Sequence, residues 1–194
     1  MRAQTQASSP SAAFGPTLRR VRQKQGLSIE RLAEKSRVSR AMLSQIELGQ
    51  STPTVNIVWK IATALDVPFS ALLGDEPKAN TSVVRRAESR VLTSNKNAFT
   101  SRALFPAHGA SPGELYELRF APESREESEA HAAGTTEHIV IVEGQLIITA
   151  GERYVLEAGD AIVFEADVPH TYENVQKKEA QAMLVMTYAS QFRS

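Results

Sequence analysis

The segment 39–47 carries the side chains of the chain best suited to contact another molecule. Helical spacing places Leu43 and Ile46 on one side of this segment, where they can be buried. The opposite side carries small or hydrogen-bonding groups without net negative charge: Arg40, Ala41, Ser44 and Gln45. Arg, Gln and Ser side chains read base edges in the major groove of DNA, and small residues allow close approach. We interpret this face as a DNA-reading surface; the alternative is an ordinary solvated helix face.

The residues around this segment predict a small helical domain over residues 14–73. Apolar residues recur there at helical spacing, and Gly26 is suited to end a first helix. Ser28, Ser39 and Thr54 are good N-caps for three further helices, and residues 68–73 predict a short fifth one. Only about three residues join the second helix to the third, which forces a sharp crossing plugged by Val38. We expect a loose tail over 1–13.

The second half of the chain has the pattern of a β domain. Residues 74–84 are polar and include a proline, so we place a linker there and a second domain over 85–194. Alternating apolar runs follow, with turns at about 8–10-residue intervals, which indicates a sandwich or small barrel. These runs cover residues 99–105, 114–121, 137–142, 145–150, 153–158, 160–166 and 181–188.

Composition excludes several classes of function. The 194 residues contain no cysteine, so thiolate chemistry and disulfides are absent. The net charge is zero, but residues 1–77 carry ten basic and six acidic side chains, whereas residues 78–194 carry twelve and sixteen. A basic half joined to an acidic half suggests two tasks. No apolar run is long enough to span a bilayer, so we expect a cytoplasmic protein without a membrane partner.

Residues 29–49, IERLAEKSRVSRAMLSQIELG, resemble the helix-turn-helix of the phage-repressor-like, or XRE, family. The flanking segments complete that family's five-helix domain. The resemblance implies that helix 39–47 enters the major groove and that Ser28 and Ile29 present backbone N–H groups to phosphate. The DNA-contacting residues are then Ser28, Ile29, Ser39, Arg40, Ala41, Ser44 and Gln45. Arg37 departs from the glycine usual in the turn, at a cost of about 1 kcal/mol if it is left-handed.

Residues 131–144 and 151–174 resemble the two motifs of the cupin family, a β-barrel (jelly roll) fold. The matching positions are His131, Glu137, Gly144, Gly159, Pro169, His170 and Asn174. The family's metal site would fall on His131, Ala133, Glu137 and His170, and alanine cannot coordinate a metal. The remaining two histidines and one carboxylate suffice for one divalent metal, Zn, Fe or Ni, with open positions. A metal-free polar pocket is the alternative.

Strand parity locates the side chains relative to this pocket. His131 and Glu137 have the same parity and can face one interior, whereas His138 should point to the other face. His108 falls in a loop-like stretch without an assigned role. We expect an effector pocket formed by His131, Glu137, Ile139, His170 and Tyr172, with Ile141, Val163 and Met183 as further walls.

The sequence therefore predicts an α+β multidomain protein with a five-helix DNA-binding bundle and a cupin barrel. Our first hypothesis is a transcriptional regulator, not an enzyme, that binds an operator as a homodimer and senses a small molecule. The resemblance links some members to sulfur or amino-acid metabolism. The alternatives are a metal-dependent cupin oxygenase or isomerase that carries a DNA-binding domain, and a DNA-binding scaffold whose cupin domain only dimerises.

Overall fold

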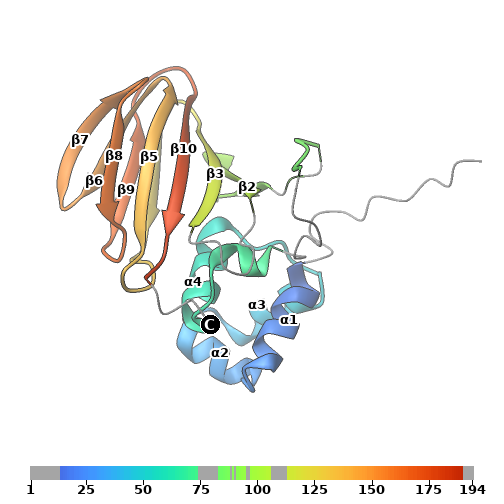
Figure 1. Cartoon of the computed structure of the whole chain (residues 1–194). Coiled ribbons are helices and arrows are strands. Elements are labelled where there is room, and N and C mark those ends of the chain that lie inside the picture. Colours follow the sequence, from blue (N-terminus) through green and yellow to red (C-terminus); the bar gives the residue numbers. More distant parts are fainter. Residues whose placement is uncertain are drawn as a thin grey trace, which may run out of the picture.

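The computed structural model describes residues 14–73, 83–87, 89, 91–94, 97–105 and 113–189. The predicted tail 1–13, most of the predicted linker and His108 lie outside the described residues. Two parts follow one another along the chain, first helical and then strand-rich (Figure 1). The α+β architecture is thus as expected from the sequence. None of the helices in the described ranges is long and apolar enough to cross a membrane.

The helical part contains four α-helices and a 3₁₀-helix: α1 Phe14–Lys24, α2 Ile29–Ser36, α3 Arg40–Glu47, α4 Val55–Leu65 and η2 Phe69–Leu72. The expected fifth helix is the 3₁₀-helix η2, which forms a single tight turn of four residues after Pro68. Apolar side chains from all five elements form one core that includes Leu18, Leu32, Leu43, Ile61 and Leu72. Val38 in the turn is buried, as expected for a plug.

The helix boundaries follow from local backbone chemistry. The Ser28 hydroxyl accepts a hydrogen bond from the Arg31 backbone N–H, and the Ser39 hydroxyl accepts one from Met42. Both therefore act as the predicted N-caps. Thr54 occupies the N-cap position of α4 without a side-chain capping bond. Arg37 ends α2 in the left-handed region, with φ 54° and ψ 25°, where glycine would be unstrained.

Two contacts fix α3 against α1. A β-carbon at Gly15 would lie 2.4 Å from the carbonyl oxygen of Ile46, so only glycine permits this close approach. Arg22 and Glu47 form a bidentate ion pair, with Nε–Oε1 and Nη2–Oε2 distances of 2.6 and 2.9 Å. Both side chains are largely buried, so the pair sets the position of the C-terminal end of α3.

The strand-rich part forms two packed antiparallel sheets. The six-stranded sheet has the order β1-β2-β3-β10-β5-β8 and the four-stranded sheet the order β4-β9-β6-β7. This is the two-sheet barrel expected for a cupin. The strands are β1 Val91–Thr93, β2 Phe99–Phe105, β3 Gly113–Phe120, β4 Ser124–Ser128, β5 Thr136–Glu143, β6 Gln145–Ala150, β7 Glu152–Glu157, β8 Ala161–Glu165, β9 His170–Asn174 and β10 Ala180–Thr187.

Strand register corrects two of the predicted pocket walls. Val163 of β8 pairs with His138 and is 58% exposed, so it shares the outward face on which His138 was expected and is found. Met183 of β10 pairs with Val140, which is also exposed, and so faces away from the interior. Because directly paired residues point to the same face, the inward residues of β10 are Leu184 and Met186 instead.

The helical part packs against one end of the barrel, with α4 and η2 nearest to the strands (Figure 1). The contacts are direct. Asn56 of α4 donates hydrogen bonds to Glu126 and to the backbone carbonyl of Glu127, and Lys60 forms an ion pair with Glu129. On the η2 side, the Ser70 backbone N–H donates to the buried carboxylate of Glu114.

Candidate DNA-binding face and cupin centre

The outward face of α3 is accessible. Arg40, Ala41 and Gln45 are exposed and Ser44 is half-buried, while Leu43 and Ile46 are buried beneath them. Arg40 Nε lies 3.0 Å from Glu30 Oε1 at the start of α2. Both partners are well exposed, so this ion pair contributes little and can be exchanged for a contact with DNA. The four predicted base-facing residues therefore lie on one helix surface.

The residues predicted to contact phosphate lie at the N-terminus of α2. Ser28 is exposed, and Glu30 lies beside it in the first turn. Ile29 is half-buried and packs against the helical core, so its side chain is a core group and only its backbone is suited to the predicted contact.

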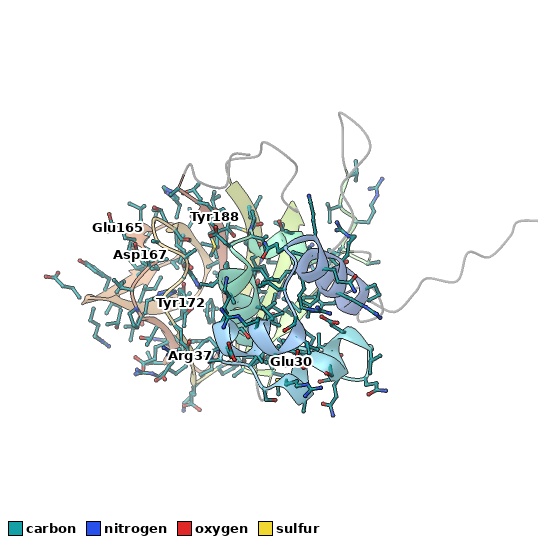
Figure 2. All side chains as sticks on the ribbon, turned by 90° about the horizontal axis from the view of Figure 1, so that it is seen from below. Glu30, Arg37, Glu165, Asp167, Tyr172 and Tyr188 are labelled. Atoms are coloured by element: carbon teal, nitrogen blue, oxygen red, sulfur yellow. The ribbon has the colours of Figure 1, made fainter. Side chains whose placement is uncertain are left out.

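Figure 2 shows Glu30 and Arg37 on the helical side of the molecule and Glu165 and Asp167 on the barrel side.

Two histidines and a glutamate meet inside the barrel. His131 precedes β5, Glu137 lies on β5 and His170 begins β9, so three separate segments converge. His131 Nε2 lies 3.0 Å and His170 Nε2 lies 3.6 Å from the same oxygen, Glu137 Oε1. All three side chains are buried, and their candidate ligand atoms lie within 4.8 Å of one another. Ala133 is exposed.

Hydrogen bonding fixes the tautomer of His170. Its Nδ1 lies 2.8 Å from the carbonyl oxygen of Val168, which can only accept, so Nδ1 carries the proton. Burial lowers the pKa of His170 despite the opposing charge of Glu137, and therefore favours the neutral ring. The lone pair of Nε2 then points toward Glu137, and this atom has no hydrogen-bond partner among the described residues. Such an orphaned buried imidazole nitrogen is suited to a metal.

The carboxylate of Glu137 is held by both sheets. Its Oε2 accepts a short hydrogen bond from the Tyr172 hydroxyl on β9. Burial raises the pKa of Glu137, but the hydrogen bond and charge of His131 outweigh it, so the pKa lies below its ordinary value. Burial and the charge of Glu137 raise the pKa of Tyr172 well above 10. The site therefore presents an anionic carboxylate oxygen and imidazole nitrogens, which fit a divalent cation.

The space around this cluster is divided in two. A cavity of about 30 Å³ lies inside the barrel, lined by His131, Glu137 and Tyr172 together with apolar side chains. A much larger cleft of about 980 Å³ lies between the helices and the barrel, and His131 and His170 reach it. Of the predicted effector-pocket residues, Ile139 is buried on the inward face of β5 but lines neither space.

Sequence reasoning missed the contribution of the helical domain to this site. Trp59 of α4 lines both the cavity and the cleft, and its ring stacks on His131 with a centroid distance of 4.1 Å and an interplanar angle of 29°. Its other contact is Phe69 of η2, at 4.2 Å. The helical spacing of Trp59 in the sequence predicts only that it packs within the helical core. The sequence signal for this contribution was a large aromatic residue close to the polar Asn56 and Lys60 on the same helix.

A helix-turn-helix bundle joined to a cupin barrel defines a class of DNA-binding transcriptional regulators, and the chain belongs to this XRE-type family. Residues 18–72 match the helix-turn-helix family model, and residues 116–186 match that of the cupin domain. The arrangement of the two matched regions along the chain is the one predicted. The function as a DNA-binding transcriptional regulator follows from this membership.

Individual relatives match most of the chain. The HTH-type transcriptional regulator SutR of Escherichia coli K12 is 40% identical over 160 residues, covering 81% of this chain and 85% of the relative. The HTH-type transcriptional regulator PuuR of the same strain is 24% identical over 178 residues, covering 86% and 90%. The crystal structure of an HTH_3 family transcriptional regulator from Vibrio cholerae superimposes with a TM-score of 0.76 at 28% identity, covering 93% and 97%.

Proposed function

We propose that this regulator acts in the cytoplasm by reading a specific operator with the exposed face of α3, under the control of a small molecule that the cupin domain binds. The observation that supports this most is the pairing of an accessible, capped recognition helix with a buried polar centre in one chain. An effector changes operator occupancy only if it binds two arrangements of the domains with different affinity.

A homodimer is part of this proposal. The basic half has a modest excess of four positive charges, so one copy makes few phosphate contacts, and two copies on one duplex multiply them. The outer face of the six-stranded sheet also exposes several valines, which is unusual for a surface that stays in water: Val140, Val142, Val163 and Val185. We propose this face as the contact between the copies.

Selection of bound duplexes from a random pool tests both parts. We expect one enriched sequence with two related half-sites whose centres lie about 34–36 Å apart or a multiple of it. Equal recovery of all sequences would contradict operator recognition. A single unpaired half-site would contradict the dimer alone. Replacement of Val163 by Glu tests the contact surface, because it should convert the dimer to a monomer in sedimentation while leaving the fold intact.

We also propose that His131, Glu137 and His170 hold one divalent metal ion, Zn, Fe or Ni. The metal would supply a Lewis acid with open positions, while Tyr172 and the Val168 carbonyl hold the ligands in place. Metal analysis of protein purified without chelator is the test, and less than about 0.1 equivalent would contradict the proposal. His170→Ala should abolish binding, whereas His138→Ala, which changes an exposed histidine, should retain it.

The second candidate function is a metal-dependent cupin enzyme, an oxygenase or isomerase, with the DNA-binding domain as an anchor. The three-ligand set favours it, because open positions on a metal can bind a substrate. The small inner cavity of about 30 Å³ argues against it, since an organic substrate would meet the ligands only from the outer cleft. A DNA-binding scaffold without any ligand is the third reading. Absence of a thermal shift with every metabolite of a broad panel would favour that scaffold.

A further inference from the structure

The mouth of the barrel is closed by the DNA-binding domain of the same chain. Val55, Asn56 and Trp59, three residues of α4, line the internal cavity together with Glu137 and Tyr172 of the barrel. Trp59 lies between this cavity and the outer cleft, since it lines both. The indole therefore lies between the cleft, which His131 and His170 also line, and the inner cavity, which Glu137 lines.

The size of the enclosed space limits what the closed arrangement can hold. About 30 Å³ corresponds to one water molecule or one metal ion, whereas sites for small organic molecules occupy about 300–1,000 Å³. A metal ion thus fits beside Glu137 with Trp59 in place. An organic effector does not fit there. The outer cleft gives it contact with His131 and His170, and it reaches Glu137 only where the indole now lies.

The contacts between α4 and the barrel combine an aromatic stack, apolar packing and a few polar pairs. Trp59 stacks on His131, and Val55 lies against the apolar lining of the cavity. The Asn56 amide donates to Glu126 Oε1 at 3.1 Å and to the Glu127 carbonyl at 3.3 Å. The Lys60–Glu129 ion pair has a distance of 2.7 Å, with Glu129 69% exposed. Hydrogen bonds and exposed ion pairs of this kind each contribute modestly. A ligand that replaces the stack of Trp59 on His131 with its own contacts competes directly with this interface.

We propose that α4 is a lid on the cupin site, and that an organic effector binds by displacing the Trp59 indole from His131. This inference rests on the proposed function and adds the route by which the site controls DNA binding. The helical domain cannot stay docked on the barrel while an organic effector occupies the position of the Trp59 indole. Because α4 shares its core with α2 and α3, displacement of the lid moves the recognition helix together with it.

Charge placed behind the lid tests the proposal without knowledge of the effector. Asn56→Asp puts a carboxylate against the buried carboxylate of Glu126 and should open the lid. Thr63→Asp is the matched control, since it adds the same charge at an exposed position of the same helix. Trp59 is the only tryptophan of the chain, so its fluorescence reports the lid alone. We expect the acrylamide quenching constant to rise at least about twofold in Asn56→Asp, and affinity for the selected duplex to change at least about fivefold. Neither should change in Thr63→Asp.

Exchanging the charges of the Lys60–Glu129 pair separates opening of the lid from misfolding. Lys60→Glu should raise quenching and alter duplex affinity in the same direction, and adding Glu129→Lys should restore both. The lid is disproved if quenching stays at the wild-type level in both single variants. Increased quenching with duplex affinity equal to that of Thr63→Asp disproves the coupling and leaves operator recognition standing. A wild-type protein that does not prefer its selected duplex removes the coupling together with the proposed function.

Discussion

Two of the groups of buried polar side chains in the barrel are clusters around a carboxylate. His131, Glu137 and His170 form one, and Glu114 with the hydroxyls of Tyr116 and Tyr188 forms the other, where the two tyrosines donate to one carboxylate. Burial and the charge of Glu114 raise the pKa of both tyrosines well above 10, so both remain donors. Polar groups in an apolar interior are tolerated when each has a partner. Two buried nitrogens of the described barrel residues have no hydrogen-bond partner, Arg102 Nε and His170 Nε2, and only the imidazole nitrogen can ligate a metal.

The turn at Arg37 provides a prediction about stability. We expect Arg37→Gly to raise the free energy of unfolding by about 0.3–1 kcal/mol, because glycine relieves the left-handed strain while adding freedom to the unfolded chain. Lys35→Gly, two residues earlier within α2, should lower it by about 1 kcal/mol. Urea unfolding followed by circular dichroism measures both. Destabilisation of similar size in the two variants would show that Arg37 makes contacts worth more than its strain.

Glu117 provides a prediction about acid stability. The hydrogen bond from Arg102 lowers its pKa to about 2, helped by Arg119 and opposed by burial. Between the ordinary value of 4.5 and about 2, the unfolded chain takes up a proton that the folded chain does not. The stabilisation is therefore complete above pH 4.5 and is lost as the pH falls toward 2. Glu117→Gln should remove this part of the pH dependence, measured by unfolding across that range. The exposed Glu143→Gln should keep it.

At the scale of elements, the sequence predicts those strands whose apolar residues follow a regular pattern. It does not predict strands that form because of the neighbouring strands with which they pair. β2 and β6 have the predicted bounds, because their apolar residues alternate or run continuously. β4 and β9, with sequences SREES and HTYEN, were not predicted as strands. Polar strands of this kind form because they pair with each other and because β9 also pairs with β6, which no local pattern reveals. The prediction that Val163 of β8 and Met183 of β10 face the interior was wrong for a related reason, because strand pairing sets which residues point inward.

Helix capping provides the prediction at this scale. Ser39→Ala should lower the free energy of unfolding by about 1 kcal/mol, because the Met42 N–H loses its acceptor. Fraying of α3 should also weaken binding to the selected duplex severalfold. Thr54→Ala is the comparison, since Thr54 sits at an N-cap without a capping bond and should cost clearly less. Equal losses in the two variants would argue that the capping hydroxyl of Ser39 has no special role.

At the scale of the whole molecule, both domains and the composition of the histidine cluster were predictable from motif residues. Their relation in space was not. The stacking of Trp59 on His131 joins residues 72 positions apart, and it depends on how the helical part docks on the barrel. Docking combines this stack and apolar packing with polar contacts such as Asn56–Glu126, whose side chains look like ordinary surface residues in the sequence. This docking brings the candidate sensor next to the DNA-binding domain.

The measurement that tests the central claim most directly compares affinity for the selected duplex with affinity for a scrambled duplex of equal composition, at one salt concentration. We expect the wild-type protein to prefer the selected duplex by at least about 10³-fold. Gln45→Ala and Arg40→Ala should each reduce this preference by about 5–150-fold with little change on the scrambled duplex, because each removes a base contact worth about 1–3 kcal/mol. Gln23→Ala, an exposed change on α1, should leave the preference intact. Equal affinity for both duplexes, or a preference unaffected by the two α3 variants, would contradict the account.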